Sequence, residues 1–116
     1  MPKLNELEQN IRQWGIDRNI TAKGGATVQS QASKGLEEMA ELFQTLGLIR
    51  EVDESGAFIN GHLENKLKDD IGDVVVCMIQ AARLAGTDLT ECVEQSWNDI
   101  KDRKGTMRNG KFYKEV

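Results

Sequence analysis

Residues 34–42 of the sequence read KGLEEMAEL, and residues 69–74 read DDIGDV. Each stretch contains two acidic residues three positions apart, a spacing that places both side chains on one face of an α-helix, with Cβ atoms about 5–6 Å apart. Like charges at this spacing repel each other, and a cation between them would relieve the repulsion. Two facing helices with such pairs would therefore form an oxygen-only site suited to Mg²⁺ or Mn²⁺. The four acids are Glu38, Glu41, Asp70 and Asp73.

The helical phase of these acids distinguishes a binding site from an ordinary charged surface. With about 100° between successive residues, Glu38 and Glu41 fall on one narrow stripe of their helix, whereas Glu37 points away toward solvent. The adjacent apolar stripe consists of Leu36, Met39, Phe43 and Leu46. The second acid pair borders an apolar face made of Leu67, Ile71, Val74, Met78 and Ala81. Unpaired charge at the edge of a core is unfavourable, which favours metal ligands over the alternative of solvated acids on surface helices.

Hydrophobic periodicity predicts four helices. Their expected bounds are about Pro2 to Ile16, Thr27 to Leu46, Glu64 to Ala85, and Asp88 to Arg103. The run VVVCMI at residues 74–79 also fits a buried strand, but the long apolar period around it and the lack of a partner strand favour a helix. Residues 49–63, which contain the single histidine, His62, are expected to form a loop.

The third helix and the C-terminal residues indicate how the bundle is completed. From Val74 onward the third helix is apolar nearly all round, which is typical of a helix buried on several sides. A chain of 116 residues can hardly bury it alone, so we expect a homodimer or a dimer of dimers.

Asn109-Gly110 is a two-residue hairpin signal. The predicted fold class is therefore all-α, with one domain over residues 1–116, a four-helix bundle completed by dimerisation, and a short C-terminal hairpin or arm.

Composition argues against several classes of protein. The net charge of −4 argues against non-specific binding of duplex nucleic acid, which needs a basic surface. The sequence lacks an apolar run of membrane-spanning length, and its first residues lack the features of a signal peptide. Cys77 and Cys92 lack metal-type spacing and are expected to be buried free thiols in a reducing compartment, which predicts a cytoplasmic location.

The combined pattern K-x-x-E-E-x-x-E-L, followed about thirty residues later by an acid and I-G-D-V, resembles the MazG-type all-α nucleoside triphosphate pyrophosphohydrolases. The family signature is E-x-x-E, a variable gap, and E-x-x-D, and the resemblance covers residues 31–103. One departure is Asp70, where the family usually has glutamate. Its shorter side chain allows weaker ligation, ligation through water, or a role shared with Asp69.

The resemblance implies a MazG-like bundle and a Mg²⁺-dependent enzyme that converts a (d)NTP to a (d)NMP and pyrophosphate. The four acids named above would hold Mg²⁺, with Mn²⁺ as an alternative. Such ions polarise phosphoryl oxygens and lower the pKa of a bound water, which would attack the α–β linkage. The candidate catalytic residues are Glu38 and Glu37, the latter as a general base or an outer ligand. Homodimers or dimers of dimers are common in this family.

Cations and an aromatic ring are expected to hold the nucleotide. Lys34 lies one turn before Glu38 on the same stripe. The residues that resemble the phosphate-contacting cluster of the family are Asn98, Lys101 and Arg103, together with Lys104. An equally plain role for these cations is to stabilise a helix C-terminus. Weaker candidates for phosphate binding are Arg108, Lys111 and Lys114, and the candidates for base binding are Trp14 and Gln31, with Gln13 and Asn19. The simplest interpretation of Trp14 is a core residue.

Two other interpretations fit the sequence. The chain could be a helical oligomerisation or adaptor module, in which the acid pairs are only solvated surface. It could also be a metal-dependent phosphohydrolase that cleaves the terminal phosphate and releases orthophosphate instead of pyrophosphate. The sequence does not rank the nucleotide bases as substrates.

Overall fold

The computed structural model describes residues 3–48 and 61–115. Within these ranges the chain forms four α-helices, a short 3₁₀ turn and a two-stranded sheet. In chain order these are α1 (Leu4–Asp17), η1 (Ala22–Gly24), α2 (Val28–Leu48), α3 (Gly61–Leu84), α4 (Leu89–Ile100), β1 (Gly105–Arg108) and β2 (Lys111–Lys114). The predicted helices are confirmed, and the ambiguous run at residues 74–79 is helical. None of the described helices combines the length and the apolar character that crossing a bilayer requires.

Two predicted boundaries are wrong by about one turn. Helix α3 begins at Gly61, so the last three residues of the predicted loop are helical, and the backbone of His62 lies in the first turn of a helix. Glu64 in the same turn suits the positive end of the helix dipole. The remainder of the predicted loop, residues 49–60, lies outside the described residues. Helix α4 ends at Ile100, three residues earlier than predicted, because the chain turns before strand β1.

Local side-chain chemistry fixes the starts of α2 and α4. Thr27 Oγ1 accepts a hydrogen bond from the Ser30 backbone N–H at 2.9 Å, and Ser30 Oγ accepts one from the Thr27 N–H at 2.9 Å. The Asp88 carboxylate accepts a hydrogen bond from the Glu91 N–H at 2.7 Å. These bonds satisfy backbone donors that a helix leaves unpaired at its first turn. The sequence predicts that these helices start at Thr27 and Asp88, and the two caps confirm both starts.

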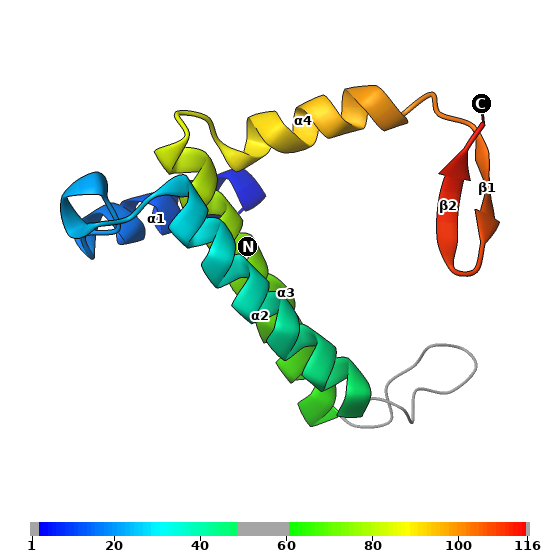
Figure 1. The fold of residues 1–116 in the computed structure, drawn as a ribbon, viewed down its shortest axis with the longest axis horizontal. Coiled ribbons are helices and arrows are strands. Elements are labelled where there is room, and N and C mark those ends of the chain that lie inside the picture. Colours follow the sequence, from blue (N-terminus) through cyan, green and yellow to red (C-terminus); the bar gives the residue numbers. More distant parts are fainter. Residues whose placement is uncertain (1–2, 49–60, 116) are drawn as a thin grey trace.

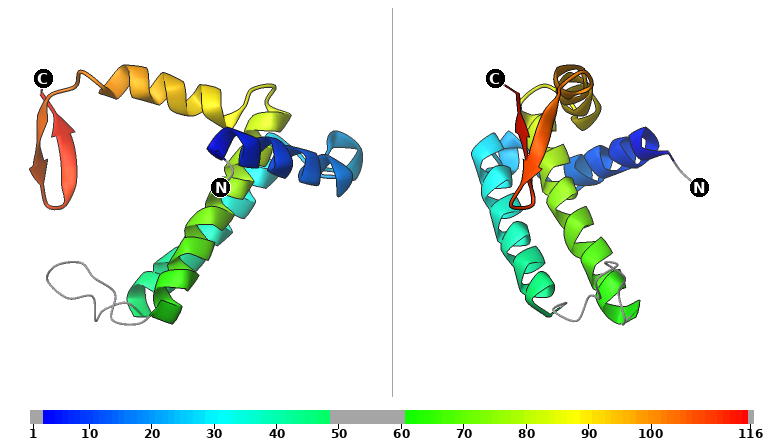
Figure 2. Two further views of the ribbon diagram at one scale, coloured as in Figure 1. Left: turned by 180° about the vertical axis from the view of Figure 1, so that it is seen from behind. Right: turned by 90° about the vertical axis from the view of Figure 1, so that its right-hand side faces the viewer.

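Helices α2 and α3 form a long antiparallel pair that is the body of the molecule (Figure 1). Their backbones approach closely at Gly35, where an added Cβ would lie 2.7 Å from Met78 Cε of α3. Helix α1 crosses one end of this pair, and α4 leaves the same end in the opposite direction (Figures 1 and 2). Both α1 and α4 pack on α3 less extensively than α2 does.

The C-terminal hairpin lies at the far end of α4 (Figure 1). Strands β1 and β2 pair antiparallel, with Arg108 opposite Lys111. Asn109 and Gly110, which connect them, have φ angles of 52° and 78°, as a type I′ turn requires. The hairpin that the sequence predicts at Asn-Gly is therefore confirmed.

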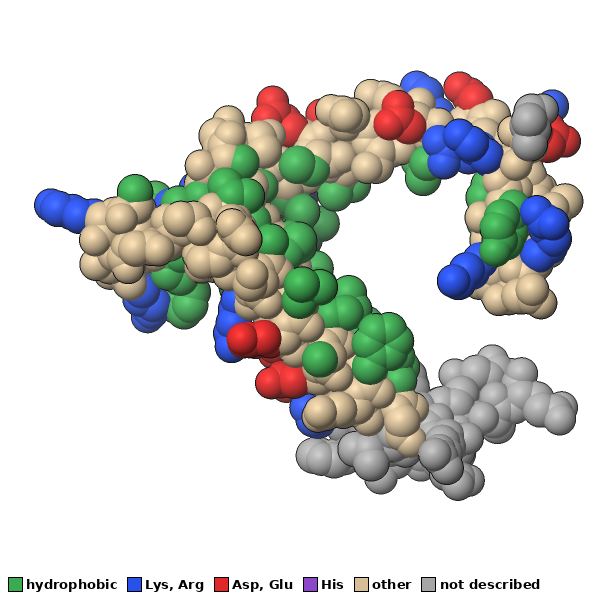
Figure 3. Space-filling model, viewed as in Figure 1, with side chains coloured by type: hydrophobic (Ala, Val, Ile, Leu, Met, Phe, Trp, Pro, Cys, Tyr) green, Lys and Arg blue, Asp and Glu red, His purple; other side chains and the backbone are tan. Residues whose placement is uncertain are grey.

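The interior of this chain is small. Among the apolar residues of the described ranges, Cys77, Ile79 and Ala81 are buried, all of them on α3. The apolar stripe on α2 is not covered within one chain: Leu36 is 73% exposed and Phe43 is 67% exposed. The reason is that α1 and α4 lie at one end of the α2–α3 pair and leave its long side open. Figure 3 shows apolar side chains along the hollow between the α2–α3 pair, α4 and the hairpin.

Candidate functional site

Five of the predicted site residues line one pocket between α1, α2 and α3. The pocket has a volume of about 390 Å³. Its predicted residues are Trp14 from α1, Gln31, Lys34 and Glu38 from α2, and Asp73 from α3, and its other residues are Ile20, Val76, Cys77 and Gln80. The fold thus brings together candidates for base, phosphate and metal binding that lie up to 59 positions apart in the sequence. We call this the acidic pocket.

Three of the four predicted metal ligands interact electrostatically. Burial raises the pKa of Glu38, whose side chain is 14% exposed, and the nearby carboxylates of Glu41 and Asp73 raise this pKa further. Lys34 acts in the opposite direction and only in part offsets these effects. Because carboxylates this close disfavour each other's ionised forms, a bound cation would relieve the repulsion.

Lys34 is held at the acidic pocket by two carboxylates. Its Nζ lies 3.0 Å from Glu37 Oε2 and 3.7 Å from Glu38 Oε1. The hydrogen bond to Glu37 is the largest of the effects that raise the pKa of Lys34, so the amine stays charged. The Glu37 side chain is 67% exposed, which confirms the prediction that it faces solvent. Lys34 therefore offers a fixed positive charge next to the acids.

Asp70, the fourth predicted ligand, lies in different surroundings. Its side chain is 2% exposed, and it accepts a hydrogen bond at Oδ2 from the hydroxyl of Thr45, which is also buried. Lys66 Nζ lies 3.2 Å from Oδ1. The bond from Thr45 and the proximity of Lys66 lower the pKa of Asp70 against the opposing effect of burial. With both oxygens engaged, Asp70 fastens α3 to α2, and direct metal ligation by Asp70 stays a prediction.

The acids fit a divalent cation in donor type and in charge. Glu38, Glu41 and Asp73 supply hard oxygen donors of the kind that Mg²⁺ prefers. Within residues 3–48 and 61–115, however, no group of three or more His, Cys, Asp and Glu side chains is already arranged to hold a metal ion. Binding would therefore require rotation of these side chains toward one another. Glu41 and Asp73 are exposed and can rotate toward Glu38, which is half-buried.

The other predicted phosphate-binding residues lie away from the acidic pocket. Asn98 lines a separate polar depression on α4, together with Glu91 and Asp99. Lys101 and Arg103 follow the end of α4 and are exposed. Because α4 and the hairpin extend to the side opposite α1 (Figure 1), these groups do not meet the acidic pocket of their own chain.

In comparisons with known proteins, no family model, no curated protein and no solved structure matches this chain. Membership of the MazG-type family therefore stays a prediction that depends on the two acid pairs and their surroundings.

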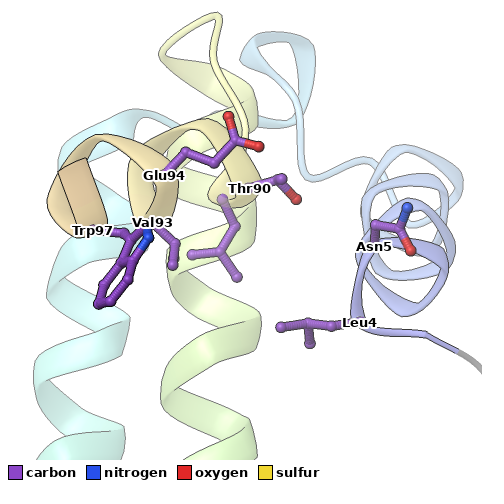
Figure 4. A pocket seen from close by; sticks show the side chains of 7 residues that line it. Leu4, Asn5, Thr90, Val93, Glu94 and Trp97 are labelled. Carbon is purple, nitrogen blue, oxygen red and sulfur yellow. The ribbon is translucent and has the colours of Figure 1, made fainter. Parts of the chain in front are cut away.

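A second pocket, with a volume of about 320 Å³, lies between α1 and α4. Figure 4 shows Leu4 and Asn5 of α1 on one side and Val93 and Trp97 of α4 on the other. Its lining is mostly apolar, and among the described residues that form it Glu94 is the one that carries a charge. This part of the lining suits an apolar side chain and does not supply a cation for a phosphate.

Two buried polar residues were not identified by the sequence reasoning. The Glu8 carboxylate on α1 accepts hydrogen bonds from the backbone N–H groups of Leu89 at 2.5 Å and Thr90 at 3.2 Å, and from the Thr90 hydroxyl at 2.7 Å. Gln80 of α3 donates from Nε2 to the Ile11 carbonyl at 2.8 Å. The available signal for Glu8 was its place on the apolar stripe of α1, where a charge indicates a buried partner.

Proposed function

We propose that this protein is a Mg²⁺-dependent nucleoside triphosphate pyrophosphohydrolase of the MazG-like type, which converts a (d)NTP to a (d)NMP and pyrophosphate. The observation that carries the proposal is the meeting of five predicted residues in the acidic pocket. They come from three helices, and the sequence predicts that they bind the base, the phosphates and the metal ion of one metal–nucleotide complex. If the acids were only a solvated surface, as in an adaptor module, there would be no reason for these five residues to lie at one pocket.

The base would bind at the α1 side of the acidic pocket. Trp14 is 42% exposed, and the Arg18 guanidinium lies 4.7 Å from the centre of its ring. An exposed indole offers a face on which a base can stack, and Gln31 at the same pocket can both donate and accept hydrogen bonds at a base edge. The Trp14 ring is thus available for stacking and is not a core residue of this chain.

The triphosphate would bind at the acid side of the same pocket. Glu38, Glu41 and Asp73 would hold Mg²⁺, or Mn²⁺ as an alternative, while Asp70 keeps their two helices in register. When bound, Mg²⁺ would neutralise part of the phosphate charge and lower the pKa of a bound water. Lys34 positions the phosphates by direct attraction, and Glu37 and Glu38 are the carboxylates that can take up the proton of the attacking water.

We also infer that two copies complete the helical bundle, as a homodimer or a dimer of dimers. Leu36 and Phe43 of α2 are exposed, and Leu36 lines one apolar depression together with Val74 of α3. Ile71, one turn before Val74, is exposed as well. Covering apolar surface stabilises an assembly by about 25 cal/mol per Å², and a second copy presents a matching stripe. Both cysteines are free, with Cys77 buried and Cys92 exposed, so the expectation of burial is wrong for Cys92. Free thiols accord with the proposed cytoplasmic location.

The test is a screen of the common NTPs and dNTPs with Mg²⁺, in which pyrophosphate and orthophosphate are measured separately. The proposal expects pyrophosphate and the matching monophosphate in equal amounts, and loss of both products on chelation of Mg²⁺. Orthophosphate without pyrophosphate would instead identify a hydrolase of the terminal phosphate.

Absence of hydrolysis with every nucleotide would contradict the proposal and favour the adaptor module, which the exposed apolar stripe also fits. Sedimentation equilibrium on the same preparation tests the oligomeric state separately from the chemistry.

A further inference from the structure

Positive charge is concentrated at the C-terminal end of the chain. The sequence has 15 Lys and Arg residues and 19 Asp and Glu residues, of which residues 101–116 hold six and two, respectively. This end therefore has a net charge of +4, whereas residues 1–100 have a net charge of −8. The two parts are electrostatically complementary, and long-range attraction of this kind steers association.

The helix α4 and the β1–β2 hairpin, which we call the arm, extend away from the rest of their own chain (Figures 1 and 2). In the described residues, the extensive contacts of the hairpin are those between its own strands. Helix α4 contacts the end of α3, and its first residues, Leu89 and Thr90, bind Glu8 of α1. The arm nevertheless carries exposed apolar side chains on both of its parts. These are Val93, Trp97 and Ile100 on α4, and Met107, Phe112 and Tyr113 on the hairpin.

The hollow enclosed by the arm lies on the opposite side of the α2–α3 pair from the acidic pocket. The acidic pocket includes Trp14 of α1, and Figure 1 shows α1 and the arm on opposite sides of the pair. Figure 3 shows apolar side chains on the side of α2–α3 that faces the hollow and acidic side chains on the other edge. The arm therefore points away from the acidic pocket of its own chain.

We propose that the arm of each copy encloses the α2–α3 pair of a second copy and brings its cations to the acidic pocket of that copy. This inference rests on the proposed function and deepens it, because it makes the substrate site a composite of two chains. If the second copy places its apolar α2 stripe against Leu36 and Phe43 in the hollow, its own acidic pocket lies on the side away from the α2–α3 pair of the first copy. The hairpin that closes the hollow then faces that acidic side.

The composite site accounts for the separation of the predicted phosphate ligands. Lys101 and Arg103 are far from Lys34 and Glu38 in one chain but belong to the same substrate in the prediction. In the enclosed pair, cations of one copy and the acids of the other flank one triphosphate. Arginine binds phosphate oxygens through two parallel hydrogen bonds, so Arg103, together with Arg108 of the hairpin, suits the terminal phosphates.

Mixed dimers test which chain supplies the cations. One variant, Glu41→Gln, has a damaged pocket and an intact arm. The other, Lys101→Gln with Arg103→Gln, has an intact pocket and a damaged arm. Each alone is expected to release pyrophosphate at no more than a few per cent of the normal rate. After the two are refolded together in equal amounts, random pairing into two-fold dimers should restore about a quarter of the normal rate, because half of the dimers then contain one complete site.

Three outcomes of this experiment overturn the proposal. Failure to recover activity, in a mixture that native mass spectrometry shows to contain mixed dimers, means that the arm acts on its own chain or not at all. Normal activity of the arm variant alone means that its cations do not reach the site. Equal loss in the control Lys68→Gln, an exposed lysine of α3, means that the effect of the arm variant is only one of net charge.

A second measurement does not depend on catalysis. A photoreactive phenylalanine at position 112 is expected to cross-link two copies, with the attachment mapped by mass spectrometry to residues 28–48 or 61–84 of the other chain. The same group at Gln95, which is exposed on the polar face of α4, is the control and should not cross-link to α2 or α3 of the partner. Cross-links confined to one chain overturn the enclosure. Cross-linked dimers from a protein that hydrolyses no nucleotide would refute the proposed function and leave the enclosure standing.

Discussion

The hydroxyl of Thr45 on α2 donates a hydrogen bond to the carboxylate of Asp70 on α3, and both side chains are buried. This bond, with Lys66 nearby, lowers the pKa of Asp70 below its ordinary value of 3.8. The folded protein thus binds a proton at Asp70 less readily than the unfolded chain does. The stabilisation is present above pH 3.8 and is lost as the pH falls through the lower folded-state pKa.

Substitution Thr45→Val should therefore destabilise the fold at pH 7 more than at pH 3, because the bond it removes is already weakened in acid. The pKa of Asp70, followed by NMR titration, should rise in the variant. Urea unfolding at the two pH values measures the difference, and Thr106→Val at an exposed position of β1 is the control. An equal loss of stability at both pH values would show that packing, and not the ionised carboxylate, is responsible.

The raised pKa of Glu38 leads to the opposite prediction. Here the neutral form is favoured by folding, so stability is fully present below the ordinary pKa of 4.5 and is lost as the pH rises through the folded-state pKa. In the absence of divalent cations at pH 7, Glu38→Gln should raise the Tm. Added Mg²⁺ should raise the Tm of the unmodified protein but have little effect on the variant. The control is Glu64→Gln. If Glu38→Gln had a lower Tm than the unmodified protein when both are measured with a chelator, this account of Glu38 would be contradicted.

Glu41→Gln and Asp73→Asn should each abolish turnover while the helical circular dichroism stays unchanged. An amide is a poor replacement for a charged oxygen donor, and since even outer partners of metal ligands are worth about 10–100-fold, we expect a loss of about 100-fold or more. The release of pyrophosphate is the measurement, and Glu94→Gln on α4 is the matched control. Near-normal rates in both variants would remove these two residues from the site.

Glu8 should hold α4 in its position. It accepts three hydrogen bonds from Leu89 and Thr90, so Glu8→Gln should lower the free energy of unfolding by about 2 kcal/mol, the usual effect of losing hydrogen bonds to a buried charged group. Hydrogen exchange should become faster at the Leu89 N–H. The exposed neighbour Gln9→Ala provides the control, and unchanged exchange at Leu89 would show that other contacts fix this helix.

Two glycines in helices should respond in opposite directions to alanine. A Cβ at Gly15 would collide with the side-chain amide of Gln80, which is buried and bonded to the Ile11 carbonyl. We expect Gly15→Ala to destabilise by about 1–3 kcal/mol through overpacking. A Cβ at Gly72 meets nothing within 4 Å, so Gly72→Ala should stabilise by up to about 1 kcal/mol through helix propensity. Thermal unfolding compares the two, and a stabilised Gly15→Ala would show that Gln80 moves aside freely.

The features that the sequence predicts correctly are those set by neighbouring residues. The start of α4 at Asp88, the turn at Asn109-Gly110 and the orientation of Glu38 relative to Glu37 all depend on interactions within a few positions. The partners of Asp70 and Glu8 could not be predicted, because Thr45 and Leu89 reach them only through the packing of separate helices. The direction of the arm is equally non-local, since it depends on the turn at Gly86, with a φ angle of 81°, and on Glu8 across it.

The small interior of the chain affects how its stability depends on protein concentration. With Ile79 and two smaller apolar residues buried among those described, one chain retains little of the burial that normally offsets the loss of conformational entropy. In the proposed assembly, folding and association are therefore a single equilibrium, whose position depends on protein concentration. For such a protein, dilution acts as a denaturant.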